Sequence, residues 1–184
     1  PSQVKAFVVS GTTHLAFANR RGNSVLVLRW NATAQRFAPV QTLVQPGAMG
    51  IEPFRSGRDQ LLAVVAVGAP GGVFRWRAGA DGEMFVRESD LPTPGASYAR
   101  VLQRGADTLL AVANVRGAAG VNSTSDVYRW DGARFTPLLI LPTDGAYALD
   151  FMDVPCVASA LDGAPCGARA AERVLLAAPG RGGA

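Results

Sequence analysis

The chain has 184 residues, of which 48% are hydrophobic and 17% are charged, a balance that excludes a disordered chain and permits a buried core. Its net charge of +4 comes from scattered Arg residues rather than a basic run, so we expect neither a nucleic-acid surface nor a lipid-headgroup surface. No apolar stretch approaches the about 18 residues of a transmembrane helix and no signal-peptide pattern is present, so we expect no membrane insertion within this segment.

In chain order, four short strand-like runs make up the first unit of a repeat. A run ending at Phe7 is followed by an apolar run at residues 14–19, by Val-Leu-Arg-Trp at 27–30 and by a run from Phe37. A Gly-Ala step at residues 47–48 ends the unit. The second run returns at residues 61–66, 109–114 and 174–179, the Trp-containing run at 73–76 and 127–130, and the Gly-Ala step at 95–96 and 145–146.

The period of this repeat is typical of β-propeller blades. Leu15, Leu62 and Leu110 are 47 and 48 positions apart, near the roughly 40–50 residues of a blade. Four short apolar runs per period, separated by turn residues, predict four β-strands, and no helical periodicity is present. The sequence therefore predicts one all-β domain over residues 1–184, built of four-stranded antiparallel blades at about 5–51, 52–99, 100–149 and 150–184.

All three Trp residues of the chain occupy one position of the repeat. In a propeller each blade covers its neighbour, so a large side chain at a fixed position fills the wedge between two blades. Burial of such a ring removes on the order of 150–250 Å² of surface from water. We therefore assign a structural core role, rather than ligand stacking, to Trp30, Trp76 and Trp130.

The order Phe, then Leu-Ala eight positions later, then Val-x-Arg-Trp, Phe and Gly-Ala resembles the epilepsy-associated repeat (EAR), also called EPTP. The resemblance covers residues 5–154, resumes at Glu172, and lies in the repetition rather than in one motif. It departs at residues 65–67, where Val-Ala-Val stands in place of Ala-Asn, and the fourth copy stops before its Trp position. The resemblance implies a seven-bladed propeller that binds a protein in the extracellular space or at the cell surface.

About three and a half blades make only a partial ring, because propellers contain typically about four to eight blades. We expect the chain to be a piece of a longer protein. The remaining blades would come from that parent chain or from another chain.

Two sequons and two cysteines are the candidate modification sites. The sequons predict glycosylation at Asn31 and Asn122 if the chain is secreted. Cys156 and Cys166 lie in an insertion at residues 155–171 and stand at the base of a Gly-rich and Ala-rich loop. They form either a disulfide or two free thiols, and the extracellular setting that the family implies favours the disulfide.

Four charged residues are expected to face the central channel. Lys5, Glu52, Arg100 and Asp150 each stand two positions before Phe7 or its counterpart, on the innermost strand of a blade. Relatives of the resembled family can hold calcium there, which would make Glu52 and Asp150 the ligands. The alternative is a set of salt bridges, because the signs alternate and the two basic groups would repel a cation. We expect no cofactor, with calcium as the alternative.

No motif predicts an active site. His14 is the only His and opens an apolar run, and neither a nucleophile elbow nor a phosphate-binding loop occurs in its proper context. A zinc site would also lack ligands. We therefore expect a non-enzymatic protein-binding propeller whose contact segments are residues 20–23, 115–125 and the cysteine insertion. The alternatives are a structural subunit of a large surface or matrix assembly, and an enzyme whose active site lies on blades outside this chain.

Overall fold

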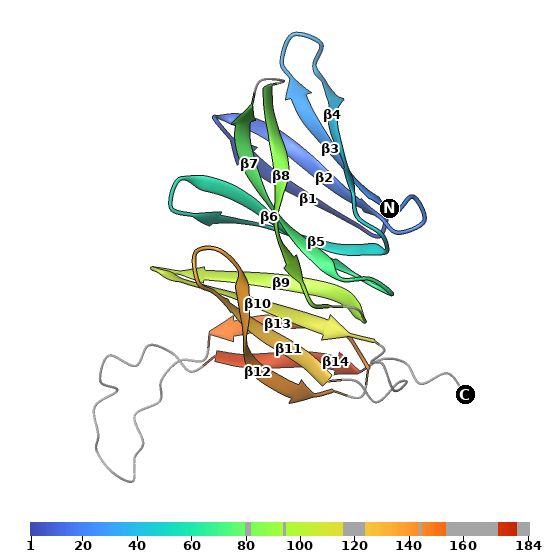
Figure 1. Ribbon diagram of the computed structural model, residues 1–184, viewed down its shortest axis with the longest axis vertical. Coiled ribbons are helices and arrows are strands. Elements are labelled where there is room, and N and C mark those ends of the chain that lie inside the picture. The colour runs from blue at the N-terminus through green and yellow to red at the C-terminus, as the bar shows by residue number, and fades with distance from the viewer. Residues whose placement is uncertain (80–81, 94, 116–123, 144, 154–172, 180–184) are drawn as a thin grey trace.

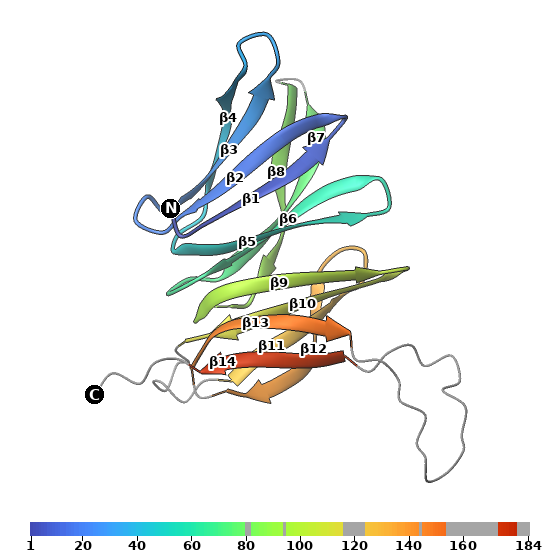
Figure 2. The ribbon, with the colours of Figure 1, turned by 180° about the vertical axis from the view of Figure 1, so that it is seen from behind.

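The computed structural model describes residues 1–79, 82–93, 95–115, 124–143, 145–153 and 173–179, and every regular element among them is a β-strand. Three four-stranded antiparallel sheets and a two-stranded fourth sheet are stacked in chain order (Figure 1, Figure 2). The first sheet contains β1 (Gln3–Val9), β2 (Thr12–Asn19), β3 (Ser24–Asn31) and β4 (Arg36–Val44). The second contains β5 (Ala48–Ser56), β6 (Asp59–Ala66), β7 (Gly71–Gly79) and β8 (Gly82–Leu91). The third contains β9 (Ala96–Arg104), β10 (Asp107–Asn114), β11 (Thr124–Trp130) and β12 (Phe135–Pro142), and the fourth contains β13 (Ala146–Asp153) and β14 (Arg173–Pro179).

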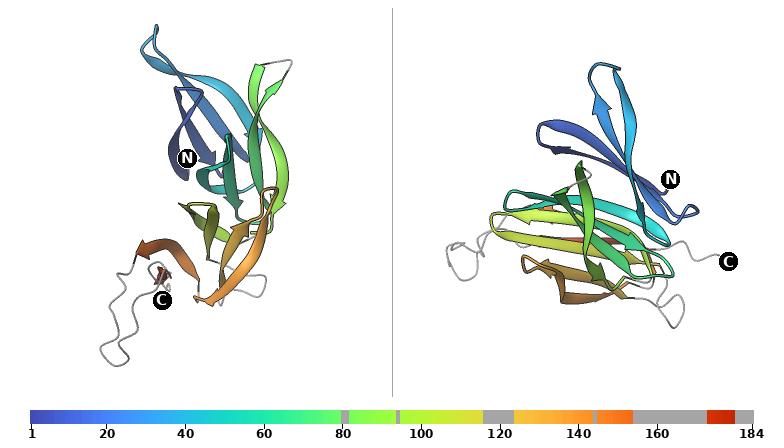
Figure 3. Two further views of the ribbon diagram at one scale, coloured as in Figure 1. Left: turned by 90° about the vertical axis from the view of Figure 1, so that its left-hand side faces the viewer. Right: turned by 45° about the horizontal axis from the view of Figure 1, so that its top comes forward.

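Each four-stranded sheet is a meander, because its strands are hydrogen-bonded in chain order. The first strands of consecutive sheets, β1, β5, β9 and β13, lie against one another, whereas the outer strands make few contacts between sheets. The first sheet and the two-stranded sheet lie at opposite ends of the stack (Figure 3). This arrangement confirms the predicted all-β fold of four-stranded, propeller-like blades, here in an open array rather than a closed ring.

The Gly-Ala step of the repeat marks the point where the chain passes from one sheet to the next. Gly47 has a φ of 64°, and a Cβ at this position would lie 2.1 Å from the Val67 carbonyl oxygen. The Val67 N–H donates to the Gly47 carbonyl at 2.9 Å, and the Val115 N–H donates to the Gly95 carbonyl at 3.0 Å. The second and third sheets therefore begin at residues 48 and 96, ahead of the blade starts predicted at 52 and 100.

The burial pattern of each second strand depends on whether sheets cover one face or both. All but the first residue of β6 are buried, because the second sheet lies between the first and the third. In β2, by contrast, buried and half-buried residues alternate. The described residues include no sheet against the other face of the first sheet. The near-continuous apolar run of β6 is thus the sequence signature of a strand covered on both faces.

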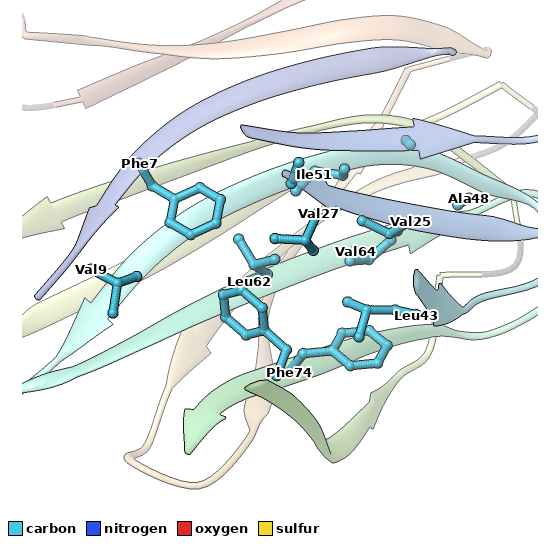
Figure 4. Close-up of a cluster of buried hydrophobic side chains, with 13 residues drawn as sticks. Phe7, Val9, Val25, Val27, Leu43, Ala48, Ile51, Leu62, Val64 and Phe74 are labelled. Atoms are coloured by element: carbon cyan, nitrogen blue, oxygen red, sulfur yellow. The ribbon is translucent and has the colours of Figure 1, made fainter. Parts of the chain in front are cut away.

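The buried side chains form clusters between consecutive sheets. The cluster between the first and second sheets includes Phe7 and Val27 from one side and Ile51, Leu62 and Phe74 from the other (Figure 4). A second cluster between the second and third sheets contains residues at most of the corresponding positions one repeat later. The hydrophobic core of this chain is therefore a series of sheet-to-sheet interfaces rather than a single centre.

The three Trp residues differ in burial although they occupy one repeat position. Trp130 is 9% exposed and Trp76 is partly buried, and both contact the sheet that precedes their own. Trp30 is 37% exposed, so within the described residues it is not buried between two sheets, and its predicted core role stays a prediction. The reason is geometric: the Trp face of the first sheet has no sheet against it among the described residues.

Candidate functional site

The inner strands bring the four predicted channel residues together as two ion pairs. The Lys5 ammonium on β1 lies 2.5 Å from a Glu52 carboxylate oxygen on β5. On the next two inner strands, the Arg100 guanidinium lies 3.1 Å from the Asp150 carboxylate. Both pairs join consecutive sheets, so the alternating charges cross-link the array at its inner edge.

The two candidate calcium ligands, Glu52 and Asp150, lie in different surroundings. Glu52 is buried, and this burial raises the pKa of its carboxyl above the ordinary value, while the hydrogen bond from Lys5 acts in the opposite direction. The side chain of Asp150 is largely exposed, and it also accepts a hydrogen bond from the Phe151 N–H. Within the described part of the chain, no three His, Cys, Asp or Glu side chains come together as a metal site would require. The arrangement of these residues is that of the salt-bridge alternative.

His14 lies in the interface between the first two sheets. Its ring is stacked on Phe7 with the ring centres 5.5 Å apart, and the edge contact with Trp76 has a centre distance of 5.2 Å. The imidazole Nδ1 is 3.0 Å from the Thr12 carbonyl oxygen and serves as the donor. Burial lowers the pKa of His14 below its ordinary value. The neutral imidazole is therefore a packing residue in an aromatic cluster.

We predict that lowering the pH destabilises the fold through His14. The unfolded chain binds a proton at His14 at a higher pH than the folded chain does, so stability present above the ordinary pKa of 6.5 is lost as the pH falls below it. The free energy of unfolding, measured by urea titration between about pH 7.5 and about pH 5.5, should fall by up to about 1.4 kcal/mol per pH unit.

The control for this prediction is His14→Leu, because Leu61 and Leu109 stand at the corresponding positions of the next two sheets. His14 is the only His of the chain, so the variant should no longer lose stability as the pH falls from about 7.5 to about 5.5, and the raised pKa of Glu52 should if anything make it slightly more stable at the lower pH. An unchanged pH dependence in the variant would contradict the assignment.

Arg75 is a buried arginine whose ion pairs only the structure reveals. It is buried, and its guanidinium lies 2.6 Å from the Asp59 carboxylate and 3.1 Å from the Glu88 carboxylate. It also donates to the Gly132 carbonyl of the third sheet at 3.2 Å. The recurring Arg before each Trp was the available sequence signal. Because two carboxylates and a carbonyl occupy its donors, Arg75 joins strands and sheets rather than presenting a free charge.

Arg87 forms a second polar cluster, at the linker between the first two sheets. It donates to the Gln45 side chain, to the Gly71 carbonyl and to the Asp90 carboxylate, each at 2.9 Å. Its guanidinium also lies over the Phe74 ring, 5.5 Å from the ring centre. The repeat carried no signal for this cluster, because Pro39 and Pro137 stand at the corresponding positions.

Of the predicted contact segments, residues 20–23 are the one that the structure fully describes. All four residues of this β2–β3 loop are exposed, and the Asn23 side chain accepts a hydrogen bond from the Gly47 N–H at 3.1 Å. The Asn23 carbonyl accepts a second one from the Gln45 N–H at 3.0 Å. These bonds hold one end of the loop against the linker to the second sheet. Residues 116–123 of the second segment, and the cysteine insertion at 155–171, lie outside the described residues.

Of the predicted modification sites, one lies within the described residues and three lie outside them. Asn31 is exposed at the end of β3, and its side-chain oxygen accepts a hydrogen bond from the Ala34 N–H at 2.9 Å. The sequon therefore lies in the hairpin turn between β3 and β4. Asn122, Cys156 and Cys166 lie outside the described residues. Glycosylation and the disulfide stay predictions.

Comparison with known proteins assigns no family and no function to the chain. Neither a protein-family model nor a curated protein matches the chain. Among the residues that the structure describes, no helix has the length and apolarity that a membrane crossing requires. The resemblance to the epilepsy-associated repeat therefore stays a prediction from the repeated residues.

Proposed function

We propose that the chain is part of an extracellular or cell-surface β-propeller of the epilepsy-associated-repeat type, which binds a protein partner and has no catalytic role. The supporting observation is a contrast within the repeat. Residues at the sheet interfaces recur from unit to unit, whereas the β2–β3 loop and its counterparts at residues 67–70 and 115–123 differ in sequence, and the third of these segments is longer than the other two. Rigid sheets that hold variable loops at one edge are a common basis for protein recognition.

The chemistry of the described side chains supports a binding role over an enzymatic one. His14 is buried between aromatic rings, where a substrate has no access to it. Glu52 and Asp150 are each paired with a basic group. The groups that sequence inspection could nominate for acid–base work are thus engaged in packing and in cross-links between sheets.

The proposal includes blades beyond those described. Three complete sheets and a two-stranded fourth fall short of the typical blade number of a closed propeller, about four to eight. We infer a seven-bladed ring, on the resemblance alone, with the other blades supplied by a parent chain or another chain. The glycan at Asn31 and the Cys156–Cys166 disulfide belong to the same extracellular proposal.

The exposed apolar residues of β12 do not support the alternative function, a structural subunit of a large surface or matrix assembly. Leu138, Leu139 and Ile140 are exposed in succession on β12. They lie in the third sheet, next to the two-stranded end of the array, where a blade would extend the stack. An assembly surface would be expected away from the ends of the array.

The test is saturable binding of the fluorescently labelled protein to intact cells. Replacing both arginines of the β2–β3 loop, Arg20→Ser and Arg21→Ser, should weaken binding by about tenfold if the loop is a contact. The matched control is Arg58→Ser, an exposed residue in the β5–β6 turn at the opposite edge of the sheets, which should bind as the unmodified chain does. Equal binding by the loop variant excludes this loop as the contact, and non-saturable binding by the unmodified chain contradicts the function.

A further inference from the structure

Each of the first three sheets has three cross-strand apolar pairs at corresponding positions of one face, and in the second and third sheets this face lies against the preceding sheet. In the second sheet these pairs are Ile51 with Val64, Leu62 with Phe74, and Trp76 with Phe85. In the third sheet they are Ala99 with Val112, Leu110 with Tyr128, and Trp130 with Phe135. In the first sheet they are Val4 with Phe17, Leu15 with Leu28, and Trp30 with Phe37, and we call these six residues the Trp30 face.

Unlike its two counterparts, the Trp30 face is uncovered. In the second and third sheets the counterparts are buried by the preceding sheet, apart from the partly buried Trp76. On the Trp30 face, Val4 is 49% exposed and Trp30 is 37% exposed, and the other four residues are partly exposed. A sheet face on which six apolar side chains are left partly exposed is typical of an interface rather than of a solvated surface.

A cluster of aromatic rings defines the geometry of each interface. Trp76 and Phe85 have ring centres 4.8 Å apart, and Phe7 of the preceding sheet lies 5.7 Å from Phe85. One repeat later, Trp130 and Phe135 are 5.0 Å apart. There Phe54 of the preceding sheet lies 5.2 Å from Trp130 and 5.3 Å from Phe135.

The first sheet already holds its own two rings in the same arrangement. Trp30 and Phe37 are 5.1 Å apart with an interplanar angle of 62°, close to the 59° of the pair in the third sheet. Two of the three rings of the cluster are therefore in place before any partner binds, so little ordering cost remains for an incoming ring.

We propose that the Trp30 face is the docking surface for one further blade of the same repeat, which inserts an aromatic ring against Trp30 and Phe37. The occupant must also have a small residue on its second strand. Ala16 and Ala63 occupy that position in the two described interfaces, and both are fully buried. A larger side chain there would hold the sheets apart. The surface thus selects a blade with an aromatic residue at the register of Phe7 and Ala at the register of Ala16.

The inference rests on the two described interfaces and not on the extracellular function proposed above. Its test extends the full chain by one blade, a copy of residues 1–47 placed ahead of residue 1. The repeat spacing of 47 between Leu15 and Leu62 keeps the copy in register with the original first sheet. Trp76→Phe, Trp130→Phe and a Trp→Phe change in the copy leave the original Trp30 as the sole Trp.

Acrylamide quenching of Trp30 fluorescence is the measurement. Docking should reduce the exposure of Trp30 from 37% toward the 9% of Trp130, so the quenching constant should fall about fourfold and the emission should shift to shorter wavelength. The reference is the unextended chain with the same substitutions. If the copy of residues 1–47 does not fold, a copy of residues 48–95, which supplies Phe54 as the incoming ring, provides the second variant.

Two changes within the added copy separate docking from a general effect of extra chain. Phe7→Ala in the copy removes the incoming ring and should restore most of the quenching. Val8→Ala in the copy is the matched control, because Val8 points away from the interface, and it should leave Trp30 protected.

An unchanged quenching constant in both extended chains, with circular dichroism showing the added strands folded, would overturn the proposal. Protection of Trp30 in the unextended chain, rising with concentration together with a doubled mass in sedimentation, would also overturn it, because the occupant would then be a second copy of the whole chain. Loss of cell binding bears on the proposed function alone and leaves the Trp30 measurement unaffected.

Discussion

Phe54→Ala should destabilise the fold by about 3–5 kcal/mol, measured by urea unfolding. The Phe54 side chain is 2% exposed and contacts both Trp130 and Phe135 of the next sheet. Its removal takes one ring out of the three-ring cluster and leaves a cavity between two sheets. The second interface should lose stability as a unit, since its remaining rings cannot collapse into the space without a shift of whole strands.

Val44→Thr is the control for this substitution. Val44 is 78% exposed on β4, and threonine retains the branched shape that suits a strand. We expect a change within about 0.5 kcal/mol. A loss below about 1 kcal/mol for Phe54→Ala would show that the sheets do not depend on the aromatic cluster for their association.

Lys5→Met should destabilise the fold by about 3 kcal/mol at neutral pH, because it leaves the buried Glu52 carboxylate without its cationic partner. The penalty depends on pH in a defined direction. Burial raises the folded-state pKa of Glu52, so ionisation of this carboxyl opposes folding as the pH rises above its ordinary value. Urea titrations at about pH 7.5 and about pH 4.5 should therefore show a smaller loss at the lower pH.

Two further variants test whether the lost stability comes from the burial of the unpaired Glu52 charge. Adding Glu52→Gln to Lys5→Met removes the unpaired charge and should recover more than half of the lost stability. Arg100→Met breaks the other ion pair of the inner row, in which both side chains are well exposed, and should cost less than about 1 kcal/mol. Equal losses for Lys5→Met and Arg100→Met would contradict the assigned role of burial.

Much of the fold was predictable because its determinants are local and repeated. Leu15, Leu62 and Leu110 are buried or half-buried on second strands, and each Val-x-Arg-Trp run lies in a third strand. A strand requires only a short apolar run between turns, and the turns were marked by Gly, Asn, Asp and Pro. The four inner charged residues were likewise found from their fixed distance to Phe7 and its counterparts.

The sequence was less informative about polar contacts between sheets. Asp59, Glu88 and the carbonyl of Gly132 meet at Arg75 although they lie on three separate segments of two sheets. No spacing within one repeat predicts such a contact, because it depends on how consecutive sheets are rotated. The same holds for Arg87, whose partners include the linker residue Gln45.

By itself, the sequence determined the repeat, the strand pattern and the faces of each sheet that carry apolar side chains, since these follow from residue order within one unit. Only the tertiary structure decided which of those faces are covered. Trp30 and Trp130 occupy one repeat position and have similar local partners, yet one is 37% exposed and the other 9%. Whether a residue is buried depends on the sheet that lies against it, and that sheet belongs to another unit of the repeat.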